Sequence, residues 1–364
     1  MMDGHGHRIP PMLKTPAYAA TDAKSPLAPF SIERREPRKG EVLIDIRYCG
    51  VCHSDIHQVR DEWGGNSLYP MVPGHEIVGH VASVGEGVTA FKPGDAVGVG
   101  CFVDSCRTCA QCEAGEEQYC QEGMTPTYNG RERGSQTLTQ GGYSTRITVD
   151  QDYVLRIPDG MPLDRAAPLL CAGITTYSPM KHYGIEAGDK VAVVGLGGLG
   201  HMAVKIARAL GAEVTVLSTS ESKRQDALDL GAHAFAATRD GDTFKQLAGS
   251  FDFIVDSVSA AHDYNAYLSL LKVDGTMILL GIPDQPVPLA AGALIMQRRK
   301  LGGSLIGGIR ETQEMLDFCA EHDIASDIEL IDIADINDAY ERMIKGDVRY
   351  RFVIDSASLG KHAA

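Results

Sequence analysis

Short apolar runs separated by glycine turns fill the first part of the chain. Residues 40–50, GEVLIDIRYCG, alternate apolar and polar side chains well enough to predict a β-strand. Residues 76–100 are dense in Val and Gly and carry turn signals at residues 85–87 and 92–95. Residues 141–162 have the pattern of two more strands. Short strands joined by glycine turns predict a small β-barrel or sandwich-like domain.

The hydrophobic pattern changes after residue 160. Residues 164–184 are helical in pattern, and residues 190–237 then alternate between strand and helix, with a glycine turn after the first strand. Further strand–helix units follow up to residue 281. Such alternation predicts an α/β fold with a doubly wound parallel sheet of the Rossmann type.

The alternation ends near residue 305, and the closing residues predict a return to the first domain. We therefore expect a discontinuous β-rich domain formed by residues 1–160 and 306–364. A Rossmann domain at residues 161–305 is expected between its two parts. The loss of the α/β alternation, rather than a linker, indicates this boundary.

The composition and charge restrict the class of protein. With 364 residues, 44% of them hydrophobic and 23% charged, the chain is long enough for two globular cores. A net charge of −14 argues against nucleic acid or an anionic membrane as a partner. No apolar run approaches the roughly 18 residues that span a bilayer, and the amino-terminal residues lack a signal-peptide pattern. We expect a cytoplasmic protein, in which His5 and His7 belong to a solvated tail rather than a metal site.

The nine cysteines indicate metal ligands or buried thiols, because the cytosol keeps thiols reduced. Four of them follow the spacing C-x₂-C-x₂-C-x₇-C, namely Cys106, Cys109, Cys112 and Cys120. Four thiolates at this spacing close a tetrahedral shell that leaves no open position, so we predict a structural zinc. An iron–sulfur cluster and a loop of free thiols are the alternatives.

A second group of metal-binding side chains lies in residues 49–57, CGVCHSDIH, and in the PGHE motif at residues 73–76. A catalytic zinc takes three protein ligands and leaves a fourth position for water or substrate. Cys52 and His75 provide two such ligands, and a third must come from further along the chain. Taken alone, a Cys and a His at this spacing are more often packed core or loop residues.

A glycine motif follows the first strand of the second domain. The sequence GLGGLG places Gly195, Gly197 and Gly200 in the G-x-G-x-x-G positions, with Gly198 and Leu199 between them. Because it follows a strand pattern and opens an Ala-rich helix, the motif is typical of a dinucleotide-binding turn. The glycines let the backbone approach the pyrophosphate at the positive helix N-terminus.

The end of the next strand indicates which dinucleotide binds. An NAD site usually places Asp or Glu there to accept hydrogen bonds from the ribose 2′-hydroxyl. This chain has Ser218, Thr219 and Ser220 instead, with Lys223 close behind. Hydroxyls and a cation suit a 2′-phosphate, so we predict NADP(H). Two observations weigh against this: Glu221 is able to turn inward, and Ser220 is also a suitable cap for the next helix, with Lys223 on its solvated face.

In this order, the motifs resemble those of the zinc-dependent medium-chain alcohol dehydrogenases over nearly the full length of the chain. The likeness is greatest to the cinnamyl alcohol dehydrogenase branch, which includes bacterial broad-range NADP-dependent aldehyde reductases. The motifs that carry it are CGVCHSDIHQ, EWGG, YPMVPGHEIVG, CRTCAQC, LLCAGITTYSP and GLGGLGH. The resemblance implies a GroES-like first domain, two zinc ions, NADP(H), and a homodimer joined at the Rossmann sheet edge near residues 294–305.

The resemblance also implies roles for residues that spacing alone does not assign. It identifies Cys171 as the third ligand of the catalytic zinc and Glu76 as an alternative ligand. Asp55 matches a carboxylate that orients the ligand histidine. Ser54 matches the hydroxyl that takes the alcohol proton, and His57 matches the next group in that relay. Without the resemblance, Ser54 and His57 would be interpreted as polar loop residues.

The implied reaction is the reversible reduction of aromatic and aliphatic aldehydes to primary alcohols. Zinc polarises the aldehyde oxygen, NADPH delivers a hydride to the carbon, and Ser54 passes on a proton from His57. Trp63, the only tryptophan, lies in the EWGG motif that borders the substrate entrance in the resembling branch. We predict that Trp63 stacks on aromatic substrates, with loop packing as the alternative.

Three other functions are alternatives. Related oxidoreductases that reduce enones or quinones without a metal would lack the set Cys52, His75 and Cys171. An NAD-dependent polyol or secondary alcohol dehydrogenase would keep zinc but would more naturally carry an acidic residue at Ser218. A non-enzymatic redox sensor that binds zinc and nucleotide is the third, and an open ligand set with a proton relay argues against it.

Overall fold

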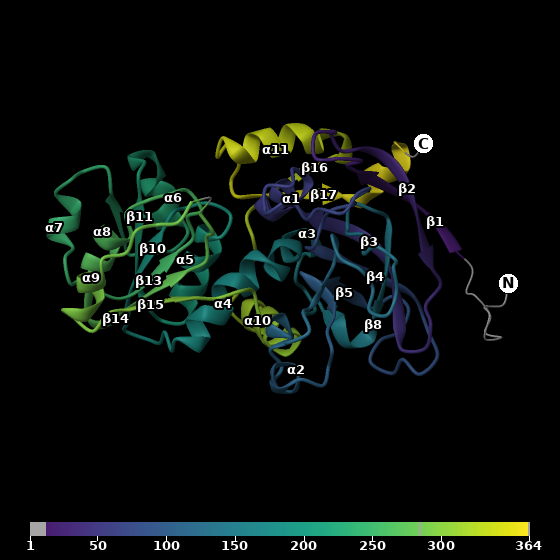
Figure 1. Ribbon diagram of the computed structural model, residues 1–364, viewed down its shortest axis with the longest axis horizontal. Helices are drawn as coiled ribbons and strands as arrows, with labels where there is room; N and C mark the ends of the chain where they lie inside the picture. Colours follow the sequence, from purple (N-terminus) through teal and green to yellow (C-terminus); the bar gives the residue numbers. More distant parts are fainter. Residues whose placement is uncertain (1–11, 284, 363–364) are drawn as a thin grey trace. The chain divides into compact units, whose positions relative to one another are not determined.

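The computed structural model of the protein describes residues 12–283 and 285–362 (Figure 1). These residues divide into two compact units. The first unit holds the described residues up to Cys171, Gly308–Ala320 and those from Ala325 onward, and the second holds Ala172–Gly307 and Glu321–Ile324. The predicted tail residues His5 and His7 lie outside the described residues. Within residues 12–283 and 285–362, no helix is both long and apolar enough to cross a membrane.

The first unit is built on a seven-stranded sheet. Six strands lie in the order β16-β17-β3-β4-β5-β9, and β8 pairs with β3. They are β3 (Glu41–Gly50), β4 (Ile77–Val84), β5 (Ala96–Val99), β8 (Arg146–Asp150), β9 (Leu155–Arg156), β16 (Ile328–Ile331) and β17 (Arg351–Asp355). The pairing is antiparallel except between β16 and β17. Since β17 pairs with β3, the closing residues belong to the first unit.

Smaller elements surround this sheet. Two strand pairs are formed by β1 (Met12–Ala19) with β2 (Ala28–Arg35), and by β6 (Phe102–Asp104) with β7 (Thr125–Pro126). The α-helices are α1 (His53–Val59), α2 (Ala110–Ala114), α3 (Leu163–Ala166), α10 (Ile309–Glu321) and α11 (Ile336–Ile344). Short 3₁₀ turns are η1 (Glu117–Tyr119), η2 (Gln151–Tyr153), η3 (Ala167–Leu170), η5 (Ile333–Asp335) and η6 (Ser356–Lys361).

Strand β3 is central because its alternation buries one set of side chains. Val42, Ile44 and Ile46 are buried, whereas Asp45 between them is exposed. Along one edge β3 pairs with β4, and along the other it pairs first with β8 and then with β17. This pairing fixes the end of β3, where the chain enters the loop that holds Cys52.

The second unit contains a six-stranded parallel sheet in the order β12-β11-β10-β13-β14-β15. Its strands are β10 (Lys190–Val194), β11 (Glu213–Ser218), β12 (Ala234–Ala237), β13 (Phe251–Asp256), β14 (Leu271–Leu279) and β15 (Lys300–Gly303). Its helical elements are α4 (Ala172–His182), α5 (Gly200–Ala209), η4 (Glu221–Lys223), α6 (Arg224–Asp229), α7 (Thr243–Gln246), α8 (Tyr264–Ser269) and α9 (Ala291–Ile295). The prediction of a Rossmann sheet is confirmed, and ligands of such sheets bind where the strand order reverses, here between β10 and β13.

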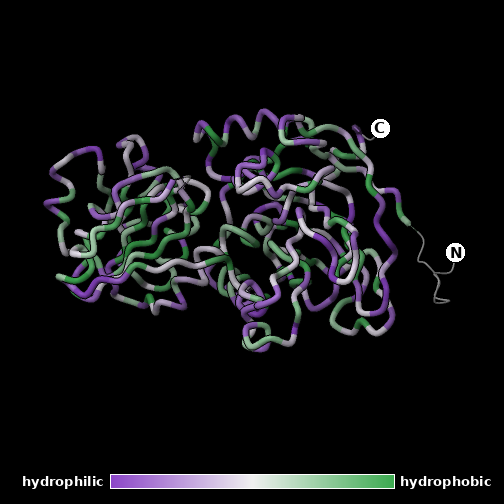
Figure 2. The backbone as a smooth tube through the Cα atoms, in the orientation of Figure 1, coloured by the Kyte–Doolittle hydropathy of each residue, from purple (hydrophilic) through white to green (hydrophobic). Residues whose placement is uncertain are grey.

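The core of the second unit lies along its parallel strands. Figure 2 shows hydrophobic backbone segments running through the sheet and more hydrophilic segments around it. Val191 and Val193 on β10 and Ile254 on β13 are fully buried. Each such side chain contributes about 1.5–3 kcal/mol relative to an exposed one. Strands that are buried on both faces have nearly continuous apolar sequences. The strands of this sheet were therefore predictable from the sequence.

The helical stretch predicted at residues 164–184 is not one helix. It is divided into α3, η3 and α4, and the break lies at Cys171 (φ −128°, ψ −66°). Pro168 in η3 lacks an N–H, and its carbonyl accepts a hydrogen bond from the Cys171 N–H at 3.3 Å. The irregular turn places Cys171 at the end of the first unit, among the other buried ligand candidates.

Candidate zinc and coenzyme sites

The chain immediately before Cys52 is held by two backbone hydrogen bonds. The Gly50 N–H donates to the Glu76 carbonyl at 2.9 Å, and the Val51 N–H donates to the Phe352 carbonyl at 2.9 Å. Cys52 is the N-cap residue of α1, so the next residues of the motif lie on the first turns of a helix. Three segments that are distant in sequence are therefore joined where the ligand candidates lie.

Four buried side chains converge on one point of the first unit. They are Cys52, His75, Glu76 and Cys171, whose ligand atoms all lie within 4.8 Å of one another. The Sγ atoms of Cys52 and Cys171 are 3.9 Å apart, and both thiols are free. Two sulfurs on a tetrahedral zinc, with bonds of about 2.3 Å, would be about 3.8 Å apart. The geometry of these residues therefore fits a zinc ion with Cys and His ligands.

Asp55 organises this group from behind. Its carboxylate is fully buried and accepts four hydrogen bonds. Oδ2 accepts from the Cys52 N–H at 2.9 Å and the Tyr143 hydroxyl at 3.3 Å. Oδ1 accepts from the Gly74 N–H and from His75 Nδ1, both at 3.2 Å. Because a carboxylate only accepts, His75 carries its proton on Nδ1, and Nε2 keeps its lone pair for a metal.

The charges around the two thiols differ. A hydrogen bond with Cys171 lowers the pKa of Cys52 well below its ordinary value, which favours a thiolate there. Hydrogen bonds with Cys101 and Cys52, together with burial, raise the pKa of Cys171. These opposite shifts favour the negative charge on Cys52 and a proton on Cys171. Metal binding would displace this proton, because thiolates rather than thiols are zinc ligands.

Glu76 is a buried carboxylate with one unpaired oxygen. Oε1 forms an ion pair with Arg351, whereas Oε2 has no hydrogen-bond partner among the described residues. Burial raises the pKa of Glu76 to about 7, although the Arg351 charge acts in the opposite direction. A buried oxygen without a partner is costly, and a cation among Cys52, His75 and Cys171 would satisfy it. This orphaned oxygen is a second feature that fits a metal ion.

The residues expected to form the proton relay lie on α1. The Ser54 hydroxyl is 3.6 Å from Cys52 Sγ. His57 Nδ1 is 2.6 Å from Glu62 Oε2, and the His57 ring stacks on Trp63 with centroids 5.1 Å apart. Within the described residues, no hydrogen bond joins Ser54 to His57. A proton would therefore need a bridging hydroxyl or water to pass between them.

The four-cysteine motif forms a second compact cluster. The Sγ atoms of Cys109 and Cys112 are 3.5 Å apart, and those of Cys106 and Cys112 are 3.9 Å apart. Both separations are far longer than the roughly 2.05 Å of a disulfide and close to the S–S edge of a zinc tetrahedron. Cys120 completes the group.

Backbone N–H groups point at several of these sulfurs. The Cys109 N–H donates to Cys106 Sγ at 3.3 Å, and the Cys106 N–H donates to Cys120 Sγ at 3.3 Å. Hydrogen bonds from backbone N–H groups, first that of Gln121, lower the pKa of Cys109 to about 6. Burial raises the pKa of Cys112 to about 11. The lowered pKa of Cys109 favours the thiolate form that a structural zinc binds, whereas Cys112 would lose its proton on metal binding.

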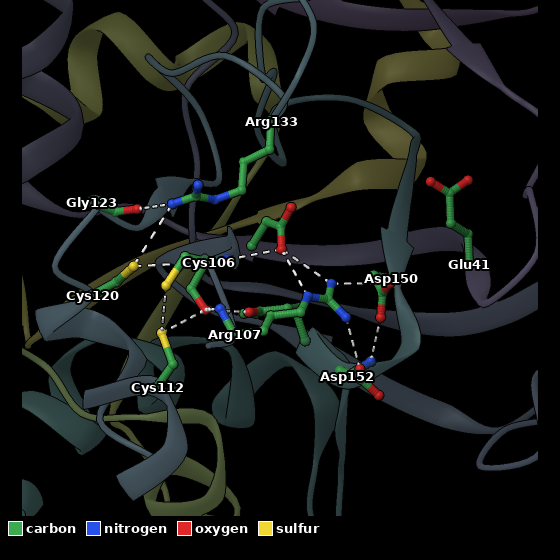
Figure 3. Close-up of polar contacts among 12 residues, drawn as sticks. Glu41, Cys106, Arg107, Cys112, Cys120, Gly123, Arg133, Asp150 and Asp152 are labelled. Carbon is green, nitrogen blue, oxygen red and sulfur yellow. Dashed lines mark hydrogen bonds and ion pairs between the residues drawn. The ribbon is translucent and has the colours of Figure 1, made fainter. Parts of the chain in front are cut away.

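Two arginines attach the cysteine cluster to its surroundings (Figure 3). The Arg107 guanidinium forms ion pairs with Asp104 and Asp150 at 3.1 Å and with Asp152 at 2.9 Å. Arg133 donates to the Gly123 carbonyl at 2.5 Å and lies 3.8 Å from Cys120 Sγ. The ion pairs of Arg107 thus tie residues 106–120, called the lobe, to β8 and η2.

The glycine turn of the second unit lies at the carboxyl end of β10. Gly195 has φ 86°, and a Cβ there would come within 2.7 Å of Val258. A Cβ on Gly200 would come within 2.1 Å of the Gly195 carbonyl oxygen. Gly197 differs, because it is exposed and a Cβ there would meet no atom within 4 Å. The protein itself leaves this space open, as expected if a pyrophosphate approaches the backbone before α5.

The remaining coenzyme candidates lie after β11. Ser218 is buried, Thr219 is exposed, and the Ser220 and Ser222 hydroxyls are 2.8 Å apart. Lys223 Nζ donates to the Leu196 carbonyl at 2.8 Å, so this cation reaches back to the glycine turn.

Two features of the sequence weigh against NADP(H): an inward turn of Glu221 and a capping role of Ser220. Glu221 pairs with Arg224 at 2.5 Å, and its side chain is 60% exposed, so it is not turned inward. Ser220 precedes η4, but no side-chain capping hydrogen bond is formed there. Both findings leave the hydroxyls and Lys223 compatible with a 2′-phosphate.

Sequence reasoning missed three residues of these sites. Arg351 and Tyr143 reach the zinc candidates only through tertiary packing, and neither lies in a motif that a single sequence reveals. Glu62 belongs to the EWGG motif, so its position five residues after His57 was a usable signal. Among the residues predicted from the sequence, Cys52, His75, Glu76 and Cys171 come together, as do the four cysteines of the lobe.

Comparisons with known proteins agree with this chemistry. Residues 38–159 match the alcohol dehydrogenase GroES-like domain, and residues 198–321 match the zinc-binding dehydrogenase family. NADP-dependent alcohol dehydrogenase C 1 of Mycolicibacterium smegmatis is 60% identical over 94% of this chain and 98% of its own length. The aldehyde reductase YahK of Escherichia coli is 54% identical over 95% and 99%.

A solved structure gives the same result. A cinnamyl alcohol dehydrogenase of Sorghum bicolor matches with a TM-score of 0.92 and 48% identity, and the match covers 95% of this chain and 98% of that one. The GroES-like fold of the first unit and the Rossmann fold of the second are therefore both confirmed. The chain belongs to the zinc-dependent medium-chain alcohol dehydrogenases, close to the cinnamyl alcohol dehydrogenase and NADP-dependent aldehyde reductase branch.

Proposed function

We propose that the protein catalyses the reversible reduction of aromatic and aliphatic aldehydes to primary alcohols with hydride from NADPH. The observation that carries this proposal is the buried set of Cys52, His75 and Cys171 with the unpaired Glu76 oxygen. A zinc ion held by this set would supply a Lewis acid for the carbonyl oxygen. Relatives named as NADP-dependent alcohol dehydrogenase and aldehyde reductase support the same reaction.

The residues around the metal ligands would position them and move the proton. Asp55 fixes the tautomer of His75, so that Nε2 faces the metal position. Arg351 balances the charge of Glu76 and keeps one of its oxygens away from the ligand set. Ser54 would exchange a proton with the substrate oxygen, and His57, held by Glu62, would pass that proton to solvent.

The coenzyme would bind at the glycine turn and the end of β11. The open space at Gly197 admits the pyrophosphate, while Gly195, Gly198, Leu199 and Gly200 shape the turn. The 2′-phosphate would accept hydrogen bonds from hydroxyls at residues 218–220 and from Lys223. A carboxylate at this place would repel the phosphate, and Glu221 is held by Arg224 instead.

A direct assay tests the function. The purified protein, loaded with zinc, is given NADPH or NADH with a panel of aldehydes that includes benzaldehyde and short aliphatic aldehydes. We expect NADPH to be consumed with both classes, at a kcat/KM well above that with NADH. Cys171→Ala should abolish turnover, whereas Cys319→Ala, which changes a buried thiol of α10 outside both clusters, should retain it. Activity confined to NADH would contradict the coenzyme assignment, and full activity without zinc would contradict the metal assignment.

Trp63 is proposed to favour aromatic substrates. One face of its ring packs on His57, and the other face would receive the substrate ring. Trp63→Ala should lower kcat/KM for aromatic aldehydes about 2- to 12-fold relative to short aliphatic ones, because an aromatic pair contributes about 0.5–1.5 kcal/mol beyond buried area. An unchanged ratio between the two classes would show that Trp63 serves loop packing alone.

The protein is also proposed to form a homodimer through the edge of the Rossmann sheet. Strand β15 ends the strand order on one side, so its outer edge is open to pairing with a second copy. Large apolar side chains are exposed beside it, with Ile295 at 72% and Met296 at 77%. Sedimentation should give a dimer for the native chain and a monomer for Met296→Asp combined with Ile295→Asp. A monomeric native protein would contradict this proposal.

A further inference from the structure

The loop that follows β13 forms one wall of the glycine turn. It runs from Ser257 to Asp263 and leads into α8. The Ser257 hydroxyl donates to the Val194 carbonyl at 2.9 Å, at the end of β10. Val258 and Ser257 also occupy the space beside Gly195, where a Cβ would come within 2.7 Å of the first and 3.2 Å of the second. The position of this loop therefore decides how closely a ligand can approach the turn.

His262 closes this loop on its own strand. Its Nε2 lies 2.8 Å from Asp256 Oδ2, and its Nδ1 lies 2.8 Å from the Ala260 carbonyl oxygen. Both partners can only accept hydrogen bonds. A neutral imidazole has one N–H, so the two bonds can form together only when the ring carries both protons.

Asp256 joins both ends of the loop through this histidine. Its Oδ2 receives the His262 bond, and its Oδ1 accepts the Val258 N–H at 3.1 Å. The Asp256 side chain is 1% exposed and that of His262 is 16% exposed. An ion pair that is shielded from water to this extent is weakened little by salt, and loss of the proton would leave a buried carboxylate without its partner.

The groups that face His262 all favour its protonated form or are neutral. Asp256 at the end of β13 and Asp263 at the N-cap of α8 are the nearby charges. Tyr264 and Tyr267 of α8 meet the ring edge-on, with centroids 4.9 and 5.2 Å away. Burial lowers the pKa of His262, but the Asp256 hydrogen bond, the Ala260 carbonyl and the two carboxylate charges together raise it above its ordinary value.

We propose that His262 is a positioning residue for the coenzyme: as an imidazolium it fastens the loop of residues 257–262 to Asp256 and thereby holds Ser257 and Val258 against the glycine turn. This inference rests on the proposed binding of NADP(H) at that turn. His262 itself touches neither the reacting atoms nor the zinc candidates.

The sign of the pH effect follows from the protonated form. A histidine with a raised pKa keeps its bonds below its ordinary value near 6.5 and loses them as the pH rises through the raised value. The loop is therefore fastened while His262 is protonated and is released as the pH rises through its raised pKa. The coenzyme's 2′-phosphate, with a second pKa of about 6 as in phosphorylated side chains, changes little above pH 7 and does not produce this effect.

The test is a fluorescence titration of NADPH into the zinc-loaded protein between pH 7 and pH 9.5. We expect the wild-type affinity to fall roughly 5- to 10-fold over this range, since one charge-assisted hydrogen bond is lost. His262→Gln should bind NADPH about 5- to 10-fold more weakly at pH 7 and show little further change. His262→Arg can donate to both acceptors at every pH, so it should restore tight binding without the alkaline loss. His182→Gln is the matched control, because His182 is an exposed histidine of the same unit, and it should follow the wild type.

Each outcome decides the proposal. It is overturned if His262→Gln binds NADPH like the wild type at pH 7, or if its affinity falls with the wild-type pH profile. If His262→Gln does not fold, as judged by circular dichroism, ¹⁵N NMR of the wild-type histidine rings decides: a neutral His262 at pH 7 would overturn the proposal. If the protein binds NADH rather than NADPH, the coenzyme proposal fails, and the same titration with NADH still tests His262, because both coenzymes present the same pyrophosphate to the turn.

Discussion

Replacing Asp55 by Asn should release the catalytic zinc while the structural zinc stays bound. The change keeps the shape of the side chain but removes its charge and turns one acceptor oxygen into a donor NH₂ group. In the structure, Oδ1 accepts from Gly74 and His75, and Oδ2 accepts from Cys52 and Tyr143. An amide can serve only one of these two pairs. The other pair then faces a donor, and if the amide oxygen stays with His75, the Cys52 N–H loses its acceptor.

The magnitude follows from these bonds. Hydrogen bonds to a charged group contribute about 1.5–3 kcal/mol each. The loss of the bonds on one oxygen, partly offset by relaxation, should cost the ligand set about 3 kcal/mol, which is roughly a 100-fold loss of zinc affinity. The effect acts on the geometry of Cys52 and His75, since Asp55 contacts the backbone of one and the ring of the other. The four-cysteine lobe makes no contact with Asp55 through these bonds, so its zinc should remain.

The assay is the zinc content per chain after equilibration with graded chelator, measured by mass spectrometry. Wild-type protein should hold two zinc ions up to high chelator concentration, and Asp55→Asn should drop to one at about 100-fold lower chelator. Asp45→Asn is the matched control, because Asp45 lies on β3 with a side chain 53% exposed and pairs only with Arg146 in the described part of the chain. If Asp55→Asn keeps both ions with the same chelator midpoint as Asp45→Asn, the positioning role of Asp55 is refuted.

Three further variants test other parts of the structure. Lys223→Ala should raise the KM for NADPH about 10-fold, because one charge-assisted hydrogen bond to the phosphate is lost. The KM for NADH should stay unchanged, and equal effects on both coenzymes would contradict a 2′-phosphate role. Cys112→Ser should lose the structural zinc. The free energy of unfolding should fall by about 2–3 kcal/mol and the melting temperature by roughly 5–10 °C. A variant that still holds two zinc ions per chain would contradict a four-cysteine site. Arg351→Leu leaves the buried Glu76 carboxylate without its partner and should destabilise the protein by about 3 kcal/mol in urea unfolding, whereas an unchanged midpoint would show that Glu76 is already neutral.

The fold was largely predictable because its two halves have different hydrophobic periods. After the exposed Lys190, the run VAVV of β10 is apolar and buried, as expected of a strand buried on both faces, and the glycine turn follows it directly. Strand β3 alternates from Ile44 to Arg47, as expected of a strand with one buried face, although Leu43 is buried as well. The break at Cys171 was not predicted, because residues 164–184 have helical composition and only Pro168 indicates an interruption. Tertiary packing, which draws the Cys171 thiol toward Cys52, decides the backbone there.

The candidate site was predictable only where ligands come from a local motif. The four cysteines of the lobe lie within fifteen residues, so their spacing alone indicated a closed shell. The catalytic set needed a family resemblance, since Cys171 lies 119 residues from Cys52. Arg351 lies 275 residues from Glu76, and a single sequence holds no signal for that pairing. His262 looks like an ordinary loop residue in the sequence, and only the two acceptors around its ring reveal a fixed proton.

The two cysteine clusters differ in what holds their ligands, and this difference fixes what each zinc can do. In the lobe, the sulfurs are placed by a short loop and by backbone N–H groups such as those of Cys106 and Cys109, so the ligand shell and the loop fold depend on the metal together. In the catalytic set, Cys52 and His75 lie beside strands that the sheet already fixes, through the pairing of β3 with β4 and β17. A shell that survives without its metal can bind and release a fourth ligand without unfolding. The unpaired oxygen of Glu76 lies in the catalytic ligand set. A ligand exchange during turnover would be needed in that set.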